Sequence, residues 1–220
     1  MYALRMTQFA ALGKMAELRE VHAAQARVRQ AQGIRASLTA PIVGGAPRLI
    51  IGLAFETLAD LQALRERNLS DKQFQAFAAK AAQLIAKPGE SELWEVLTPA
   101  QTGSDPSYLQ RITYTAAMGK NRALHEMLEK RVAQRQAEGV RCSFSVQMAS
   151  DAARYSVINL FASLADFEAY RNRMRADASA QDFLEKLTPL LAASPSVELS
   201  EVIVPFQPVA ARELAAAATR

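Results

Sequence analysis

Arginine and hydroxyl side chains recur on one side of short alternating segments, and this pattern is the one in the chain best suited to binding a ligand. In the segments 34–39 and 140–145 every second residue is polar, so the polar side chains share one face of a strand. Guanidinium groups beside carboxylates and hydroxyls in an apolar cavity bind small anionic or carbonyl-bearing ligands. The candidate ligand-binding residues are Arg5, Arg35, Ser37, Glu95, Arg111, Tyr114, Arg141, Ser143 and Glu201.

A structural role for the same residues stays open, and their recurrence in both halves of the chain favours it. Arg5 and Glu95, like Arg111 and Glu201, could form salt bridges that fix the register of the strands. Tyr114 at strand spacing is equally compatible with a core position.

The two histidines do not have the spacing of a metal site or of a catalytic pair. His22 falls on the apolar side of a predicted helix, and we expect it to be buried, whereas we expect His125 to be exposed. The sequence has no Gly-x-Ser-x-Gly elbow and no phosphate-binding glycine loop. We therefore predict no metal and no cofactor, and we assign no catalytic residue.

The elements that must position these residues occur twice. A shift of 106 positions aligns Tyr2 with Tyr108, Arg5 with Arg111 and the Gly13-Lys14 pair with its second copy, without a gap. A fixed period of this kind indicates a tandem structural repeat. We predict a first repeat at 1–98, a linker at 99–107, a second repeat at 108–206 and a C-terminal tail at 207–220.

Positions at which the two copies differ are where a site present in only one half should be sought. Gln8 aligns with Tyr114, and Leu53 aligns with Asn159. Cys142, the single cysteine, aligns with Ala36, and we expect it to be a small core residue.

Each repeat reads as strand, helix, strand, strand, helices, strand, which is the ferredoxin-like order. The alternation of apolar residues predicts strands, and the glycine-terminated Ala- and Glu-rich stretches predict helices. In the first repeat the predicted strands are 2–9, 34–39, 48–55 and 93–98, and the predicted helices are 14–32, one that begins at Thr57, and 71–85. The second repeat has the same elements 106 positions later.

The strands at 48–55 and 154–161 carry apolar residues on both faces. Helices can cover only one face of such a sheet, and leaving the other in water costs about 25 cal/mol for each square ångström of apolar surface. We therefore predict an α+β fold in which two tandem ferredoxin-like repeats form a fused α/β barrel of eight strands, with the helices outside.

The two segments that open the repeats, with Tyr2, Arg5 and Gly13-Lys14 and with Tyr108, Arg111 and Gly119-Lys120, resemble the start of NIPSNAP-like proteins. The whole repeat resembles the dimeric α/β-barrel superfamily, which includes cofactor-independent monooxygenases and isomerases. The resemblance implies a protein that binds a small organic molecule in the barrel. Two alternatives stay open: a cofactor-independent monooxygenase or isomerase acting on a small aromatic or lactone-like substrate, and a protein-interaction scaffold with a filled barrel.

Composition limits the partners. The chain has 220 residues, a formal net charge of +4 and no apolar run long enough to span a membrane, so we expect a cytoplasmic protein. The arginine-rich stretches lack interleaved aromatic residues, which argues against nucleic acid as a partner. A homodimer of the fused chain is left open.

Overall fold

The structure is a computed structural model that describes residues 1–43, 46–101 and 103–206. The tail predicted at 207–220 lies outside the described residues. Within the described part, no helix combines the length and the apolar character needed to cross a membrane.

The element order of the two repeats follows the prediction. The first repeat contains β1 (Tyr2–Ala10), α1 (Met15–Ala31), β2 (Arg35–Pro41), β3 (Arg48–Phe55), α2 (Leu58–Ser70), α3 (Lys72–Ala82) and β4 (Ile85–Thr98). The second contains β5 (Tyr108–Thr115), α4 (Asn121–Ala137), β6 (Cys142–Gln147), β7 (Arg154–Phe161), α5 (Leu164–Ala176), α6 (Ala178–Leu187), a 3₁₀ turn (Thr188–Leu190) and β8 (Ser196–Val204).

The strands pair in the same register in both repeats. β3 lies antiparallel between β1 and β2, and Leu4 stands opposite Leu53. β7 lies in the same way between β5 and β6, and Gln110 stands opposite Asn159. The hydrogen-bonded order of all eight strands is β1-β3-β2-β8-β5-β7-β6-β4, which closes a barrel and confirms the predicted α+β fold class.

The chain forms two compact units that exchange the ends of their last strands. The first unit consists of residues 1–93 and the chain from Glu201 onward, and the second unit of residues 94–200. The end of β4 therefore pairs with β6 of the second unit, where Trp94 stands opposite Gln147.

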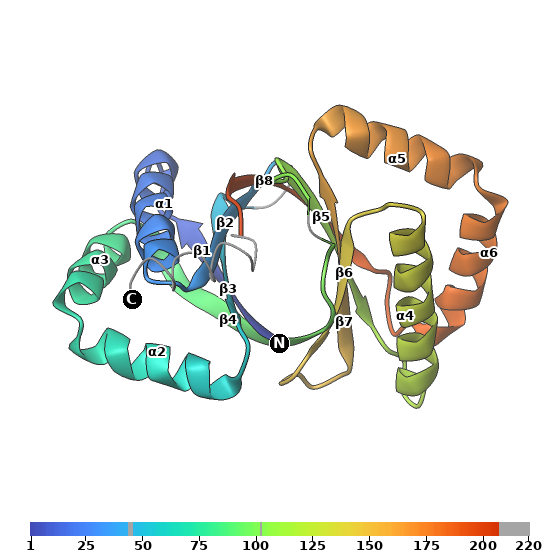
Figure 1. Cartoon of the computed structure of the whole chain (residues 1–220), viewed down its shortest axis with the longest axis horizontal. Helices are drawn as coiled ribbons and strands as arrows, with labels where there is room; N and C mark the ends of the chain where they lie inside the picture. Colours follow the sequence, from blue (N-terminus) through green and yellow to red (C-terminus); the bar gives the residue numbers. More distant parts are fainter. Residues whose placement is uncertain (44–45, 102, 207–220) are drawn as a thin grey trace, which may run out of the picture. The chain divides into compact units, whose positions relative to one another are not determined.

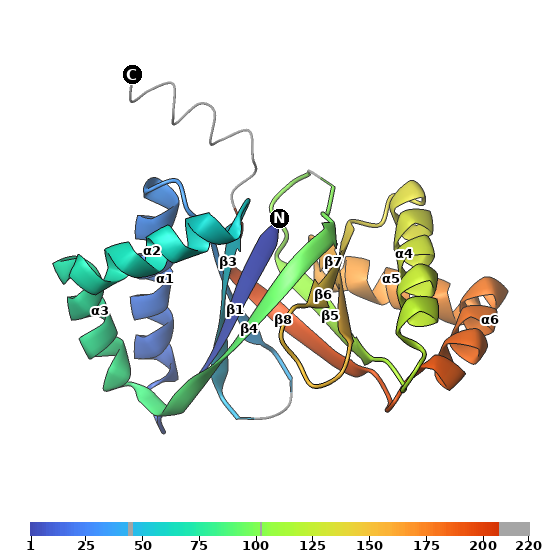
Figure 2. The ribbon, with the colours of Figure 1, turned by 90° about the horizontal axis from the view of Figure 1, so that it is seen from below.

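In each unit the helices cover one face of the sheet. α1, α2 and α3 lie on one side of the β1–β3–β2 sheet, and α4, α5 and α6 lie on one side of the β5–β7–β6 sheet (Figures 1 and 2). Alternate residues of the central strands pack under the helices, such as Leu49, Ile51 and Leu53 in the first unit. The other residues of these strands form the helix-free face of the sheet.

β4 is longer than predicted. We predicted a helix up to residue 85, stopped by Pro88, but α3 ends at Ala82 and β4 starts at Ile85 and includes this proline. The backbone of β4 comes close to β1 at Gly89, where a Cβ atom would lie 2.8 Å from the carbonyl oxygen of Thr7. The Pro-Gly pair therefore allows a close strand contact where the sequence pattern suggested a helix end.

Candidate functional site

Arg5, Arg35 and Ser37 lie on the helix-free face of the first unit, but each of the two arginines has an acidic neighbour. Nη1 of Arg5 lies 3.0 Å from Oε2 of Glu92, and Nη1 of Arg35 lies 3.6 Å from Oε1 of Glu56. Ser37 is buried and stands opposite Gly52, so that a Cβ atom at this glycine would lie 2.6 Å from the serine Oγ. These contacts hold strands and strand ends together.

In the second unit, Arg111 is part of a polar cluster on the helix-free face. It donates a hydrogen bond of 3.1 Å to Oγ of Ser156, a fully buried residue. The guanidinium carbons of Arg111 and Arg154 lie 5.8 and 5.9 Å from the ring centre of Trp94. Cation–π contacts of this kind stabilise a buried tryptophan between two positive charges.

Arg141 and Ser143 do not join this cluster. The Arg141 guanidinium donates to the backbone carbonyls of Gln101 and Ser104, which lie in the predicted linker. Ser143 is half-buried opposite Ile158.

The expectation that Glu95 and Glu201 lie with the arginines of the helix-free face is wrong. Glu95 stands opposite Val146, which packs on the helix side of the sheet, and Glu201 pairs with Arg19 on α1 at 3.0 Å. A shift of one residue along a strand moves a side chain to the opposite face, which is why these positions are difficult to assign from sequence.

The histidine predictions have different outcomes. His22 is 5% exposed, as expected, and its Nε2 lies 2.6 Å from Oε1 of Gln8. His125, which we expected to be exposed, is half-buried, because its ring packs edge-on against Phe144 and Tyr155 at 5.5 and 5.6 Å.

Between the sheet and the helices, the second unit is polar where the first is apolar. In the first unit Leu53 is buried in this layer, and Leu4, which is partly buried, stands opposite it. At the equivalent positions Nδ2 of Asn159 donates a hydrogen bond of 3.0 Å to Oε1 of Gln110. Asn159 is the position at which the sequence comparison of the two halves suggested a one-sided site, and the structure places it in the interior of the second unit.

Asn159 is fully buried, and its Oδ1 atom has no hydrogen-bond partner among the described residues. The residue stands opposite Cys142, which is also fully buried. Because an unpaired buried acceptor costs about 1–3 kcal/mol, a group of this kind requires an explanation in a folded protein.

Arg135 of α4 lies in the same layer. It is 9% exposed, and its guanidinium carbon lies 5.7 Å from the ring centre of Tyr170 on α5. Its Nε atom is buried without a hydrogen-bond partner among the described residues. Its charge acts on Tyr114, Cys142 and Tyr170, so these residues surround it.

Tyr114, Cys142 and Tyr170 of this layer stay neutral near pH 7, because burial raises the pKa of each. Burial raises the pKa of Tyr114 to about 12, although Arg135 acts in the opposite direction. Burial also raises the pKa of the Cys142 thiol to about 11. Tyr114 thus belongs to the core layer on the helix side and not to the helix-free face with the arginines.

We predict that Cys142 reacts slowly with thiol reagents in the folded protein. Its pKa of about 11 instead of 9.0 lowers the thiolate fraction about 100-fold at pH 8. A thiol titration before and after unfolding in guanidinium checks this expectation. Equal rates in both states would contradict it.

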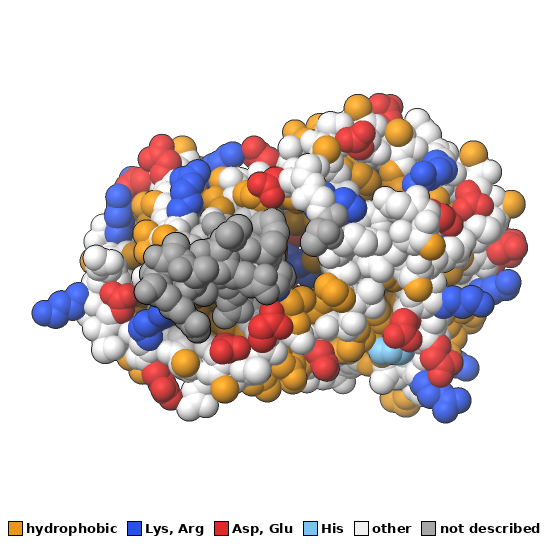
Figure 3. Space-filling view, viewed as in Figure 1, with side chains coloured by type: hydrophobic (Ala, Val, Ile, Leu, Met, Phe, Trp, Pro, Cys, Tyr) orange, Lys and Arg blue, Asp and Glu red, His pale blue; other side chains and the backbone are white. Residues whose placement is uncertain are grey.

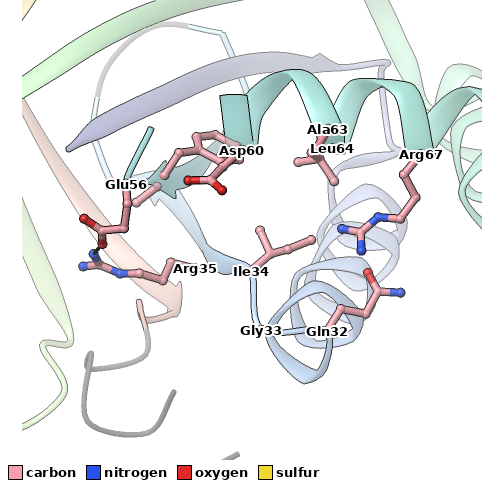
Figure 4. Close-up of a pocket in the computed structure, with 11 residues that line it drawn as sticks. Gln32, Gly33, Ile34, Arg35, Glu56, Asp60, Ala63, Leu64 and Arg67 are labelled. Atoms are coloured by element: carbon pink, nitrogen blue, oxygen red, sulfur yellow. Dashed lines mark ion pairs between the residues drawn. The ribbon is translucent and has the colours of Figure 1, made fainter. Parts of the chain in front are cut away.

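The first unit contains a pocket of about 320 Å³ between the end of α1, the start of β2, the end of β3 and α2. Figure 4 shows its polar side chains, of which Arg35 and Glu56 pair on one side and Arg67 points toward Gln32 on the other. Ile34 and Leu64 form part of the apolar wall.

The described residues do not bring metal-ligating side chains together in a cluster. Among residues 1–43, 46–101 and 103–206, no group of three His, Cys, Asp or Glu side chains could hold a metal ion.

Solved structures of other proteins share the fold of this chain. The chain is similar to a monooxygenase-like protein from Fusobacterium nucleatum, with a TM-score of 0.72, 11% sequence identity and 94% of each chain covered. A monooxygenase-like protein from Lactobacillus acidophilus gives a TM-score of 0.68, 10% identity, and coverage of 91% of this chain and 93% of that one. An anthrone oxidase-like protein gives a TM-score of 0.62 and 14% identity, with 92% of this chain and 90% of that one covered. The fold is thus that of the dimeric α/β-barrel proteins.

The sequence of the second repeat is similar to a known family. The NIPSNAP family model matches residues 109–206, which confirms for this part of the chain the resemblance seen in the Tyr, Arg and Gly-Lys motif. No curated protein matches the chain.

Proposed function

We propose that the second unit binds a small hydroxylated aromatic carbonyl compound in the layer between its sheet and its helices. The observation that carries this proposal is the buried, unpaired Oδ1 of Asn159, at a position where the first unit has Leu53. A hydroxyl group of a ligand would donate to this oxygen and offset the cost of its burial.

The surroundings of Asn159 define the rest of the ligand. Nε of Arg135 would donate to a carbonyl or phenolate oxygen, and a charge-assisted hydrogen bond of this kind is stronger than a neutral one. Phe161 and Tyr170, whose ring centres lie 5.4 Å apart, are suited to packing against an aromatic body.

Titration with para-hydroxyacetophenone tests the proposal. We expect saturable binding to the full-length protein, and binding about tenfold weaker in the Arg135→Gln variant, since it lacks a charge-assisted hydrogen bond. The matched control is Arg29→Gln, which changes the equivalent residue of the first unit and should bind as the wild type does. Equal binding of acetophenone, which has no hydroxyl group, would count against the role of Asn159.

A cofactor-independent oxidase reaction is the second candidate function. The observation that favours it is the positive charge of Arg135, which would stabilise the enolate or phenolate form of a bound substrate. Similarity to an anthrone oxidase-like protein suggests the probe. Oxidation of anthrone by dioxygen gives anthraquinone and water, and it can be followed by oxygen consumption. A rate no higher with the protein than with the Arg135→Gln variant would exclude this candidate and leave binding as the function.

A further inference from the structure

The pocket of the first unit has features of a binding site that is separate from the layer around Asn159. Its lining residues belong to α1, β2, β3 and α2, and all of them lie in the first unit. With about 320 Å³ it is large enough for a small organic molecule.

One guanidinium group that lines this pocket, that of Arg67, has no ion-pair partner among the described residues. This guanidinium group also takes part in no hydrogen bond with any of the described residues. Arg29 is 7% exposed, and its Nη1 has no hydrogen-bond partner in the described part of the chain. Burial lowers the pKa of Arg29, the positive charge of Arg67 lowers it further, and the negative charge of Asp71 acts in the opposite direction.

The second unit satisfies the equivalent pair with an aromatic ring. Arg135 and Arg173 are the counterparts of Arg29 and Arg67, and their guanidinium carbons lie 5.7 and 5.9 Å from the ring centre of Tyr170. In the first unit Leu64 stands where the second has Tyr170, and Leu64 lines the pocket. Arg29 packs instead on Phe74, with its guanidinium carbon 5.2 Å from the ring centre. The smaller Leu64 therefore leaves Arg67, among the described residues, without the aromatic contact that Arg173 has in the second unit.

Charge and shape restrict the ligand. The two carboxylates of the pocket already have partners, because Glu56 pairs with Arg35 and Asp60 accepts from the backbone N–H of Thr57 at the start of α2. Their negative charge disfavours a multiply charged anion. The apolar wall with Ile34 and Leu64 favours a carbon body next to the charged group.

We propose that the first unit binds a small monocarboxylate with an apolar body, whose carboxylate pairs with Arg67. A planar guanidinium holds a carboxylate through two parallel hydrogen bonds, which gives both affinity and orientation. This proposal does not depend on the function proposed for the second unit, since it involves different residues and a different ligand charge.

Benzoate is the probe, and benzamide is its neutral control. We expect saturable binding of benzoate to the full-length protein and about tenfold weaker binding to Arg67→Gln, which lacks the charged partner. Leu64→Tyr, which copies the second repeat, should abolish benzoate binding by filling the pocket. Arg173→Gln changes the counterpart in the second unit and should leave benzoate binding as in the wild type.

Three results would overturn this assignment: no saturable benzoate binding by the wild type, benzamide binding as tight as benzoate binding, or the same affinity in Arg67→Gln and Arg173→Gln. Arg67 is exposed, so its variant is expected to fold. The Leu64→Tyr variant also separates the two sites. It should lose benzoate binding and still bind para-hydroxyacetophenone, because the substitution changes only the first unit.

Discussion

The double variant Gln110→Leu/Asn159→Leu is expected to be more stable than the wild-type protein and to lose binding of para-hydroxyacetophenone. It copies the apolar pair of the first unit, in which Leu4 stands opposite Leu53 in the same register. Removing the unpaired Oδ1 of Asn159 should raise the free energy of unfolding by about 1–3 kcal/mol, since that is the cost of an unsatisfied buried polar atom. Urea unfolding at neutral pH gives the measurement.

Single variants show whether the pair acts as a unit. Asn159→Leu alone leaves Oε1 of Gln110 without its donor and should be less stable than the double variant. Placing the polar pair in the first unit, as Leu4→Gln/Leu53→Asn, should lower the stability of that unit. A double variant less stable than the wild type would mean that the polar pair serves the fold and not a ligand.

The second large effect is a loss of stability in acid through His22. Burial, and secondly the charge of Arg29, lower the pKa of His22 from 6.5 to about 4. Between these two values the unfolded chain takes up a proton that the folded chain does not, so stability falls as the pH falls from 6.5 to 4. The full shift corresponds to about 3 kcal/mol.

His22→Leu isolates this effect, because the second repeat has Leu128 at the equivalent position. The unfolding free energy of this variant minus that of the wild type should increase by about 3 kcal/mol when the pH is lowered from 7 to 4. His125→Leu is the control. It should lose as much stability between pH 7 and pH 4 as the wild type does, because it retains His22. If wild type and His22→Leu lose stability in parallel over this range, His22 does not have the lowered pKa.

The repeat made most of the fold predictable. Two sequences that obey one pattern remove much of the ambiguity of short apolar segments, so the strands and helices of both halves could be assigned together. The start of β4 was missed because Pro88 is typical of a helix end, whereas here it lies in a strand that contacts β1 closely at Gly89.

The candidate sites were predictable only in part. Recurrence directed attention to arginines such as Arg5, whose described contacts are structural, while the divergent pair of Leu53 and Asn159 pointed to the buried polar layer. The sequence did not indicate a binding role for Arg135, since the same residue recurs as Arg29 in the first repeat. The pocket around Arg67 depends on Leu64 in place of Tyr170, a difference in volume whose effect appears only once the helices are placed.

A crystal structure of the protein grown with para-hydroxyacetophenone would test the central claim most directly. The account predicts the phenolic oxygen within hydrogen-bonding distance of Oδ1 of Asn159, with the carbonyl oxygen near Nε of Arg135. An ordered water molecule paired with Oδ1 of Asn159, and no organic molecule between α4, α5 and the sheet of the second unit, would contradict it.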